Sequence, residues 1–220
     1  MVYRDADVEN FHKLFAPHVA TLRAMSIVER RASIETTMEP IPLAPGCATE
    51  SLDLSGVPAE KITHATAVPG KVLLHLHGGG FFAGSIKSYR HVVSRFAVAA
   101  QATAYHLDYR LAPEHPFPAA LDDAMAVYKQ LLAMGIAPDD LVIGGDSAGG
   151  NLAVALLLKA REAGLPQPGG LYLLSPWLDL TAAGESYDTV GAHDPIISRA
   201  DVAPLAAAYL DGKPIRLIED

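Results

Sequence analysis

Cysteine, positive charge and long apolar runs are all scarce in this sequence. The 220 residues include a single cysteine, Cys47, which excludes an intrachain disulfide and is typical of a reducing compartment, so we expect a cytoplasmic protein. Lys and Arg number 17 against 25 Asp and Glu, and the formal charge of −8 argues against a nucleic-acid partner or an anionic membrane surface. No apolar stretch approaches the roughly 20 residues of a membrane span, and acidic residues at 5, 7 and 9 do not make a signal peptide.

Four short, almost continuously apolar runs indicate strands that are buried on both faces. They are KVLLHLH, ATAYHLDY, LVIGGD and LYLLSPW, at 71–77, 102–109, 141–146 and 171–177. Apolar residues recur with a helical period over 89–100 and 121–132 between these runs, and a third helix is expected from just after Ser147 to Gly164. This alternation of strands and helices predicts a mostly parallel sheet.

Other patterns flank this alternation. Residues 47–64 alternate apolar and polar around Gly56, which predicts a hairpin of two half-buried strands. Residues 8–35 have apolar positions near helical spacing, interrupted by Pro17, which predicts one or two amphipathic helices. A last apolar stripe at helical spacing comprises Val202, Leu205, Ala206, Tyr209 and Leu210.

The sequence GDSAG, Gly145 to Gly149, fits the G-x-S-x-G nucleophile elbow, in which a tight turn between a strand and a helix exposes a serine hydroxyl. Its context agrees, because a buried strand precedes it and an amphipathic helix follows. The N-terminus of that helix supplies favourable potential for a developing anion. We therefore interpret Ser147 as a nucleophile. The alternative is a glycine-rich turn in which the serine has no chemical role.

A second glycine-rich stretch, HLHGGGFFAGS, follows the first buried run. Three glycines in a row would let backbone N–H groups point at a substrate oxygen without side-chain obstruction, which is the chemistry of an oxyanion hole. Gly78, Gly80 and Ala83 also match the dinucleotide fingerprint G-x-G-x-x-A. The helical period starts only near Ser88, however, whereas a dinucleotide-binding fold opens its helix inside the motif.

His75 and His77 lie two residues apart on a predicted strand and would face the same way, as a metal-binding pair does. No third ligand accompanies them at a recognisable spacing, so we expect no metal and no cofactor. The favoured interpretation is that one of the two packs beneath the glycine loop and orders it.

Four motifs occur in the order and approximate spacing of a known family. HGGGFFAGS, DYRLAPEHPFPAALDDA, GDSAGG and SPWLDLT resemble the hormone-sensitive-lipase family of bacterial carboxylesterases, the GDXG lipolytic enzymes, and the likeness extends from about Thr49 to Tyr209. The resemblance implies an α/β-hydrolase fold with a mostly parallel sheet flanked by helices. It also implies hydrolysis of carboxylic esters with short to medium acyl chains, so the expected partner is a small hydrophobic ester.

Carried onto this sequence, the resemblance makes Ser147 the nucleophile and the backbone N–H groups of Gly79, Gly80 and Ala148 the oxyanion hole. The residues that would support these motifs are His77, Gly78 and Asp146.

The resemblance also implies a division within one structural domain. Residues 1–45 would form N-terminal cap helices over the acyl site, and residues 46–220 the α/β-hydrolase core. Phe81 and Phe82 would lie near the mouth of the site, and Asp179 would be a structural support.

Serine catalysis requires a general base and a group that orients it, and in this fold the chain order is Ser, then Asp or Glu, then His. Only His193 follows Ser147 among the histidines, and Asp179, Glu185 and Asp188 are the acids that keep the order. Its place among the family's cap-side residues favours a loop histidine over a base. We therefore expect a C-terminally shortened core, without the family's last strand–helix units, in which the acid and the base are not evident.

The sequence leaves three functions open. They are a carboxylesterase of weak activity, a non-catalytic small-ligand-binding protein on the same scaffold, as in the plant gibberellin receptors that resemble this family, and an inactive truncation. An end at Asp220 would leave the run at 171–177 as an edge strand. That edge, together with the apolar stripe within 201–220, predicts self-association.

Overall fold

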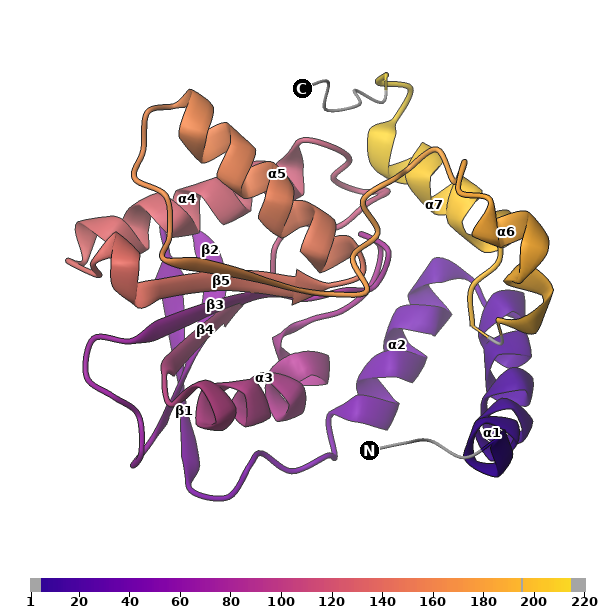
Figure 1. The fold of residues 1–220 in the computed structure, drawn as a ribbon, viewed down its shortest axis with the longest axis horizontal. Coiled ribbons are helices and arrows are strands. Elements are labelled where there is room, and N and C mark those ends of the chain that lie inside the picture. Colours follow the sequence, from indigo (N-terminus) through magenta and orange to yellow (C-terminus); the bar gives the residue numbers. More distant parts are fainter. Residues whose placement is uncertain (1–4, 195, 215–220) are drawn as a thin grey trace.

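A six-stranded sheet runs through the middle of the molecule (Figure 1). The computed structural model describes residues 5–194 and 196–214. The strands are β1 (Cys47–Leu54), β2 (Val57–His64), β3 (Val72–Leu76), β4 (Thr103–Leu107), β5 (Leu141–Asp146) and β6 (Gly170–Leu174). They lie in the order β1-β2-β4-β3-β5-β6, and the last four are parallel to one another, while β2 is antiparallel to both of its neighbours. The predicted mostly parallel sheet is confirmed.

Helices cover both faces of this sheet (Figure 1). α3 (Ile86–Ala100) lies on one face, and α4 (Ala119–Ala133) and α5 (Ala148–Glu162) lie on the other. The remaining helices gather beyond the carboxyl ends of the parallel strands, where open α/β sheets bind their ligands. They are α1 (Asp5–Ala24), α2 (Ile27–Met38), α6 (Ser186–Thr189) and α7 (Arg199–Leu210), with short 3₁₀ turns at Pro138–Asp140 and Gly191–His193.

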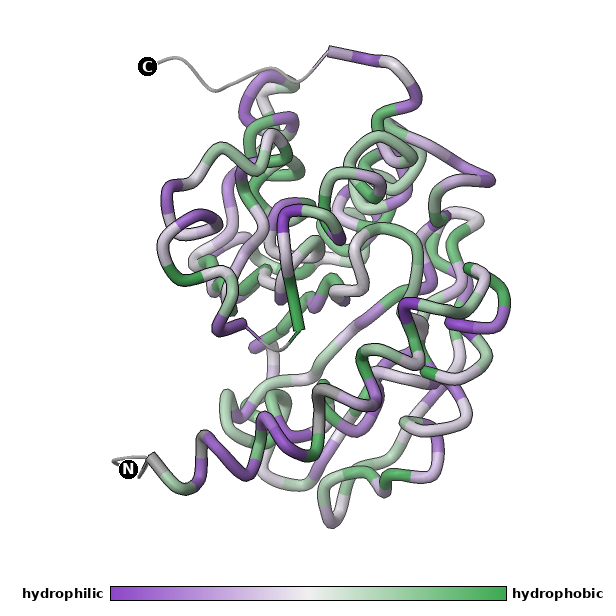
Figure 2. Tube along the Cα trace, turned by 90° about the vertical axis from the view of Figure 1, so that its right-hand side faces the viewer, coloured by the Kyte–Doolittle hydropathy of each residue, from purple (hydrophilic) through white to green (hydrophobic). Residues whose placement is uncertain are grey.

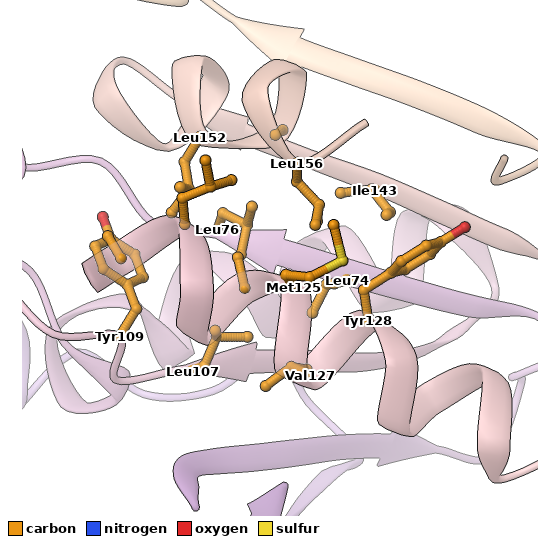
Figure 3. Packing of buried hydrophobic residues seen from close by; sticks show 14 of the residues in the cluster. Leu74, Leu76, Leu107, Tyr109, Met125, Val127, Tyr128, Ile143, Leu152 and Leu156 are labelled. Atoms are coloured by element: carbon orange, nitrogen blue, oxygen red, sulfur yellow. The ribbon is translucent and has the colours of Figure 1, made fainter. Parts of the chain in front are cut away.

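The main hydrophobic core lies between the sheet and helices α4 and α5. Figure 3 shows Leu74 and Leu76 of β3 and Ile143 of β5 packed near Leu152 and Leu156 of α5, and all five are fully buried. The intervening residues of β3 point to the opposite face, where Leu73 joins a smaller cluster under α3. Burial on both faces explains why this strand reads as a continuous apolar run.

The hairpin predicted at 47–64 is present as β1 and β2. Its two turn residues, Ser55 and Gly56, have φ angles of 59° and 84°. Positive φ at both positions is the requirement of the tight two-residue turn whose twist matches that of the flanking strands.

The N-terminal segment forms two helices, but their boundary is not at Pro17. Helix α1 continues through this proline, so the expected interruption there is wrong. The break falls at Ser26, whose hydroxyl accepts the N–H of Glu29 while the Glu29 carboxylate accepts the N–H of Ser26. This reciprocal cap begins α2. Figure 2 shows hydrophilic residues recurring along α1. Among the described helices, none has the length and apolar character needed to cross a bilayer.

Strand β6 pairs only with β5 in the described part of the chain and therefore forms an edge of the sheet, as the sequence predicts. Leu171 and Leu174 on this strand are each 44% exposed. A cavity of about 680 Å³ lies beside the edge, between α3 and the sheet face that carries Tyr172. The apolar surface of β6 is thus only partly covered by the described residues.

Candidate active site

Ser147 occupies the tight turn between β5 and α5. Its φ and ψ are 51° and −121°, a backbone conformation that residues other than glycine adopt only under strain. The turn is held by two backbone hydrogen bonds: the Ser147 N–H donates to Leu174 O at 3.0 Å, and Ser147 O accepts the N–H of Trp177 at 2.9 Å. The Ser147 hydroxyl makes no hydrogen bond with any described residue.

The glycines of GDSAG are required by close approach of the backbone. A Cβ on Gly145 would lie 2.3 Å from Leu76 O, and one on Gly149 would lie 2.0 Å from the same oxygen. Neither distance is compatible with a side chain. Strand β3 and the start of α5 therefore pack directly on the elbow, which brings the loop after β3 next to Ser147.

That loop is the glycine stretch after β3. Gly79, Gly80 and Phe81 have φ angles of 108°, 61° and 62°, so the chain follows a left-handed path there. The N–H groups of Phe82 and Ala83 donate to Gly79 O at 3.1 and 3.0 Å and close the turn. The N–H of Gly79 and that of Gly80 donate to no other described group, which leaves both available to an oxygen of a ligand.

Ser147 and this loop line one cavity of about 530 Å³. Its wall includes Gly79, Gly80 and Phe82, together with residues of α1 and α2. Apolar side chains from the helices complete it: Val19, Leu22, Ile34, Val202 and Leu205. A second cavity of about 420 Å³, with a predominantly apolar wall, also has Gly79 and Ile34 in its lining.

Helix α2 is tied to the glycine loop through Arg31. Its guanidinium donates to Phe82 O at 2.5 Å and to Ala112 O at 2.8 Å, and it forms an ion pair with Glu114. Arg31 holds the pKa of the Glu114 carboxyl at about 2. Helix α2 is thus anchored to the segment that would bind the oxyanion.

The two phenylalanines of the loop lie in different environments. Phe82 lines the cavity, as expected, with the Arg30 guanidinium 5.3 Å from its ring centroid. Phe81 does not lie at the mouth of the site. It is 1% exposed and stacks on Tyr209 of α7 at a centroid distance of 3.7 Å, because its positive φ turns the side chain into the core.

His77 lies directly beneath the loop. It is buried, its ring stacks on Tyr109 at 4.2 Å, and its Nδ1–H donates to Gly78 O at 2.7 Å. Burial lowers the pKa of His77 to about 4, so the ring is neutral near pH 7. Gly78 also donates its N–H to Asp146, at 2.9 Å. The supports expected from the sequence, His77, Gly78 and Asp146, therefore meet at one point.

The candidate acid and base lie elsewhere. His193 is exposed in the 3₁₀ turn Gly191–His193, does not line the cavity and makes no hydrogen bond to Ser147. Asp179 accepts from Thr181 and Ala183, and Asp188 pairs with Arg199. No described histidine or carboxylate contacts the Ser147 hydroxyl. The role of His193 as a base remains a prediction that the sequence itself disfavours.

Two tyrosines of the site were not singled out from the sequence. Tyr89 of α3 donates its hydroxyl to Asp146 Oδ2 at 2.8 Å, and Tyr172 of β6 contacts His75 Nδ1 at 2.6 Å. Tyr89 lies in the helix that directly follows the first glycine motif, and Tyr172 lies in the strand that follows the helix after the second.

Comparison with known proteins finds α/β hydrolases and esterases. The family model described as alpha/beta hydrolase fold matches residues 73–217. The acetyl-hydrolase of Streptomyces hygroscopicus is 40% identical over 185 residues, covering 80% of this chain and 62% of that protein. An esterase of Acinetobacter venetianus is 42% identical over 157 residues, covering 71% of this chain and 52% of its own length. The chain thus spans between half and two thirds of these relatives.

The solved structures that are similar in fold include esterases as well. A mutant of the esterase E40 superposes with a TM-score of 0.90 at 39% identity, covering 97% of this chain and 71% of that one. An esterase from the bacterial hormone-sensitive lipase family gives a TM-score of 0.87, also at 39% identity and with the same coverage of both chains.

Proposed function

The chain belongs to the hormone-sensitive-lipase family of bacterial esterases within the α/β-hydrolase fold, and from that premise we propose that it is a serine carboxylesterase with Ser147 as the nucleophile. One observation carries the proposal. Ser147, in a strained turn with an unbonded hydroxyl, shares a cavity wall with the two loop glycines whose N–H groups are free. This is the pairing of nucleophile and oxyanion donors that acyl transfer needs.

The chemistry proposed at this site has two steps. Ser147 Oγ attacks the ester carbonyl carbon, and the carbonyl oxygen becomes an oxyanion that accepts from the N–H groups of Gly79, Gly80 and Ala148. The positive end of the α5 dipole lies at Ala148 and adds to this stabilisation. The bond to the alcohol then breaks, the alcohol leaves with the proton of the serine, and water hydrolyses the acyl-serine to release the acid.

Activation of Ser147 sets the expected rate. In subtilisin, which uses the same chemistry, loss of the histidine costs on the order of 10⁶ in kcat, while binding and the oxyanion hole alone retain roughly 10³ to 10⁴ over water. Because no described histidine contacts Ser147, we expect this 220-residue polypeptide to bind esters and to turn them over weakly.

Substrate size follows from the cavities. A cavity of about 530 Å³ at Ser147, with a second of about 420 Å³ that shares Gly79 in its wall, suits a small hydrophobic ester with a short or medium acyl chain. The proposal includes residues 1–45 as a cap over the core of residues 46–220, because α1 and α2 contribute to the cavity wall. It also includes a cytoplasmic location, supported by the single free cysteine, Cys47.

The acyl-enzyme step tests the proposal. Prolonged incubation with p-nitrophenyl acetate should release up to one equivalent of p-nitrophenolate in a slow burst, because acylation proceeds without a described base, and Ser147→Ala should abolish the burst. Ser175→Ala is the matched control, because Ser175 lines the same cavity and also has a positive φ, 44°; its burst should be unchanged.

A burst that survives in Ser147→Ala would contradict the assignment. If the wild-type protein binds p-nitrophenyl butyrate without any burst or turnover, the non-catalytic ligand-binding alternative replaces the proposed esterase.

A further inference from the structure

The side chain of Asp146 joins the two segments of the candidate site. It is the last residue of β5 and immediately precedes Ser147. Its Oδ1 accepts the N–H of Gly78 at 2.9 Å, and its Oδ2 accepts the hydroxyl of Tyr89 at 2.8 Å. Both carboxylate oxygens are therefore occupied, one by the glycine loop and the other by helix α3.

Gly78 is shaped to receive this pair. A Cβ at position 78 would lie 2.2 Å from Asp146 Oδ2 and 2.9 Å from the Tyr89 hydroxyl oxygen. The first glycine position of the HGGG motif therefore requires glycine, because Asp146 and Tyr89 pack against it. The N–H of Gly78 is already hydrogen-bonded to Asp146. Only the next two glycines have N–H groups free for an oxyanion.

A buried histidine stands behind the carboxylate. His75 has no exposed surface, its Nε2 lies 3.5 Å from Asp146 Oδ1, and Tyr172 contacts its Nδ1. Burial raises the pKa of the Asp146 carboxyl, but the contacts with His75, Tyr89 and the Gly78 N–H outweigh burial and hold it below its ordinary value. Asp146 is therefore charged at neutral pH, which strengthens both hydrogen bonds that it accepts.

We propose that Tyr89 and Asp146 act as positioning residues that fix the oxyanion loop at its working distance from Ser147. The inference rests on the proposed esterase function. Oxyanion donors act only when they lie 2.7–3.1 Å from the developing charge. The loop has three consecutive residues with positive φ, so it lacks the support of a helix or strand. The hydrogen bonds to Gly79 O close its far end, and Asp146 holds its near end.

The hydrogen bond from the Gly78 N–H to Asp146 ties the glycine loop to the residue next to Ser147, so a movement of the loop is transmitted to the nucleophile elbow. Tyr89 fixes the direction of the carboxylate from α3, an element that takes no part in the chemistry. Loss of the Tyr89 hydroxyl should therefore weaken stabilisation of the transition state more than binding of the ester. The expected effect is a lower rate of acylation with little change in KM.

Three variants test the proposal. Tyr89→Phe removes the donor and keeps the ring, Asp146→Asn keeps an acceptor for the Gly78 N–H without the charge, and Asp146→Ala removes both. Tyr128→Phe is the matched control, because Tyr128 is another helical tyrosine whose hydroxyl donates to an oxygen, in its case Pro166 O at 2.5 Å, on the opposite face of the sheet; it is fully buried, whereas Tyr89 is half-buried.

Two readouts are needed: the acylation rate with p-nitrophenyl acetate, and amide exchange at Gly78 measured by NMR. We expect Tyr89→Phe to lower the acylation rate about tenfold with KM within about twofold, and to speed Gly78 exchange severalfold. Asp146→Ala should cost up to the roughly 10² to 10³ that loss of an oxyanion donor costs. Asp146→Asn should recover much of that loss. Tyr128→Phe should change neither readout.

The proposal is overturned if Tyr89→Phe leaves Gly78 exchange and the acylation rate at wild-type values, or if Tyr128→Phe lowers the rate equally. Gly78 exchange requires no activity. If the wild-type protein forms no acyl-enzyme, the proposed function fails, while the exchange data still decide whether Tyr89 and Asp146 hold the loop.

Discussion

Replacing Ser147 with glycine should stabilise the protein while removing its nucleophile. A residue other than glycine in a sparsely populated backbone region costs about 1–3 kcal/mol, and Ser147 has φ 51° and ψ −121°. Glycine relieves that strain but makes the unfolded chain more flexible, at a cost of roughly 0.5–1 kcal/mol. No hydrogen bond is lost, because the hydroxyl has no described partner. The net expectation is a gain of about 1 kcal/mol.

Ser147→Ala separates the two effects, because alanine keeps the Cβ and hence the strain. At this chain length a gain of about 1 kcal/mol raises Tm by roughly 2–4 °C, which differential scanning calorimetry resolves. Ser198→Gly is the opposite control: Ser198 has an ordinary φ of −125° and caps α7 through Asp201, so this variant should lower Tm. If Ser147→Gly melts at or below the Tm of Ser147→Ala, the turn is not strained and this reasoning is wrong.

Three further predictions concern pH, the candidate base and the sheet edge. Burial lowers the pKa of His77 to about 4 from its ordinary 6.5. As pH falls below 6.5 the unfolded chain therefore binds a proton that the folded protein does not bind. The free energy of unfolding should fall by about 3 kcal/mol from this residue between pH 6.5 and pH 4. Urea unfolding across that range should show a shallower pH dependence for His77→Gln; identical slopes would contradict the burial argument. His193→Ala should leave p-nitrophenyl acetate hydrolysis within about twofold of wild type, whereas a loss of about 10² or more would make His193 the base. The edge at β6 should cause self-association, seen by light scattering at high micromolar concentration, and a monodisperse species of 23.3 kDa would refute it.

The sequence predicted the elements of the core well because each has a strong local signal. The four apolar runs became β3 to β6, and the helical periods became α3, α4 and α5. The order of β4 and β3 in the sheet was not predicted, because hydrophobic runs do not say which neighbour a strand pairs with. Pro17 misled the reading of α1, because proline ordinarily interrupts a helix, whereas α1 continues through it.

The two glycine motifs were recognisable because backbone requirements appear directly in sequence. The hydrogen bonds that join the two motifs through Asp146 and His75 could not be recognised from the sequence, because Tyr89 and Tyr172 look like ordinary helical and strand residues. A signal was present in Gly144: a Cβ there would lie 2.2 Å from the Tyr172 ring, so the glycine makes room for that tyrosine to reach His75. Such a signal becomes legible only once the pairing of β5 with β6 is known.

Covalent trapping tests the central claim, that Ser147 is the nucleophile, most directly. The protein would be incubated at length with diethyl p-nitrophenyl phosphate, digested, and mapped by mass spectrometry. The reagent is attacked at phosphorus with loss of p-nitrophenolate, and the account predicts one diethylphosphoryl group on Ser147, absent in Ser147→Ala and present in Ser175→Ala. An adduct on any other residue, or none at all, would contradict it.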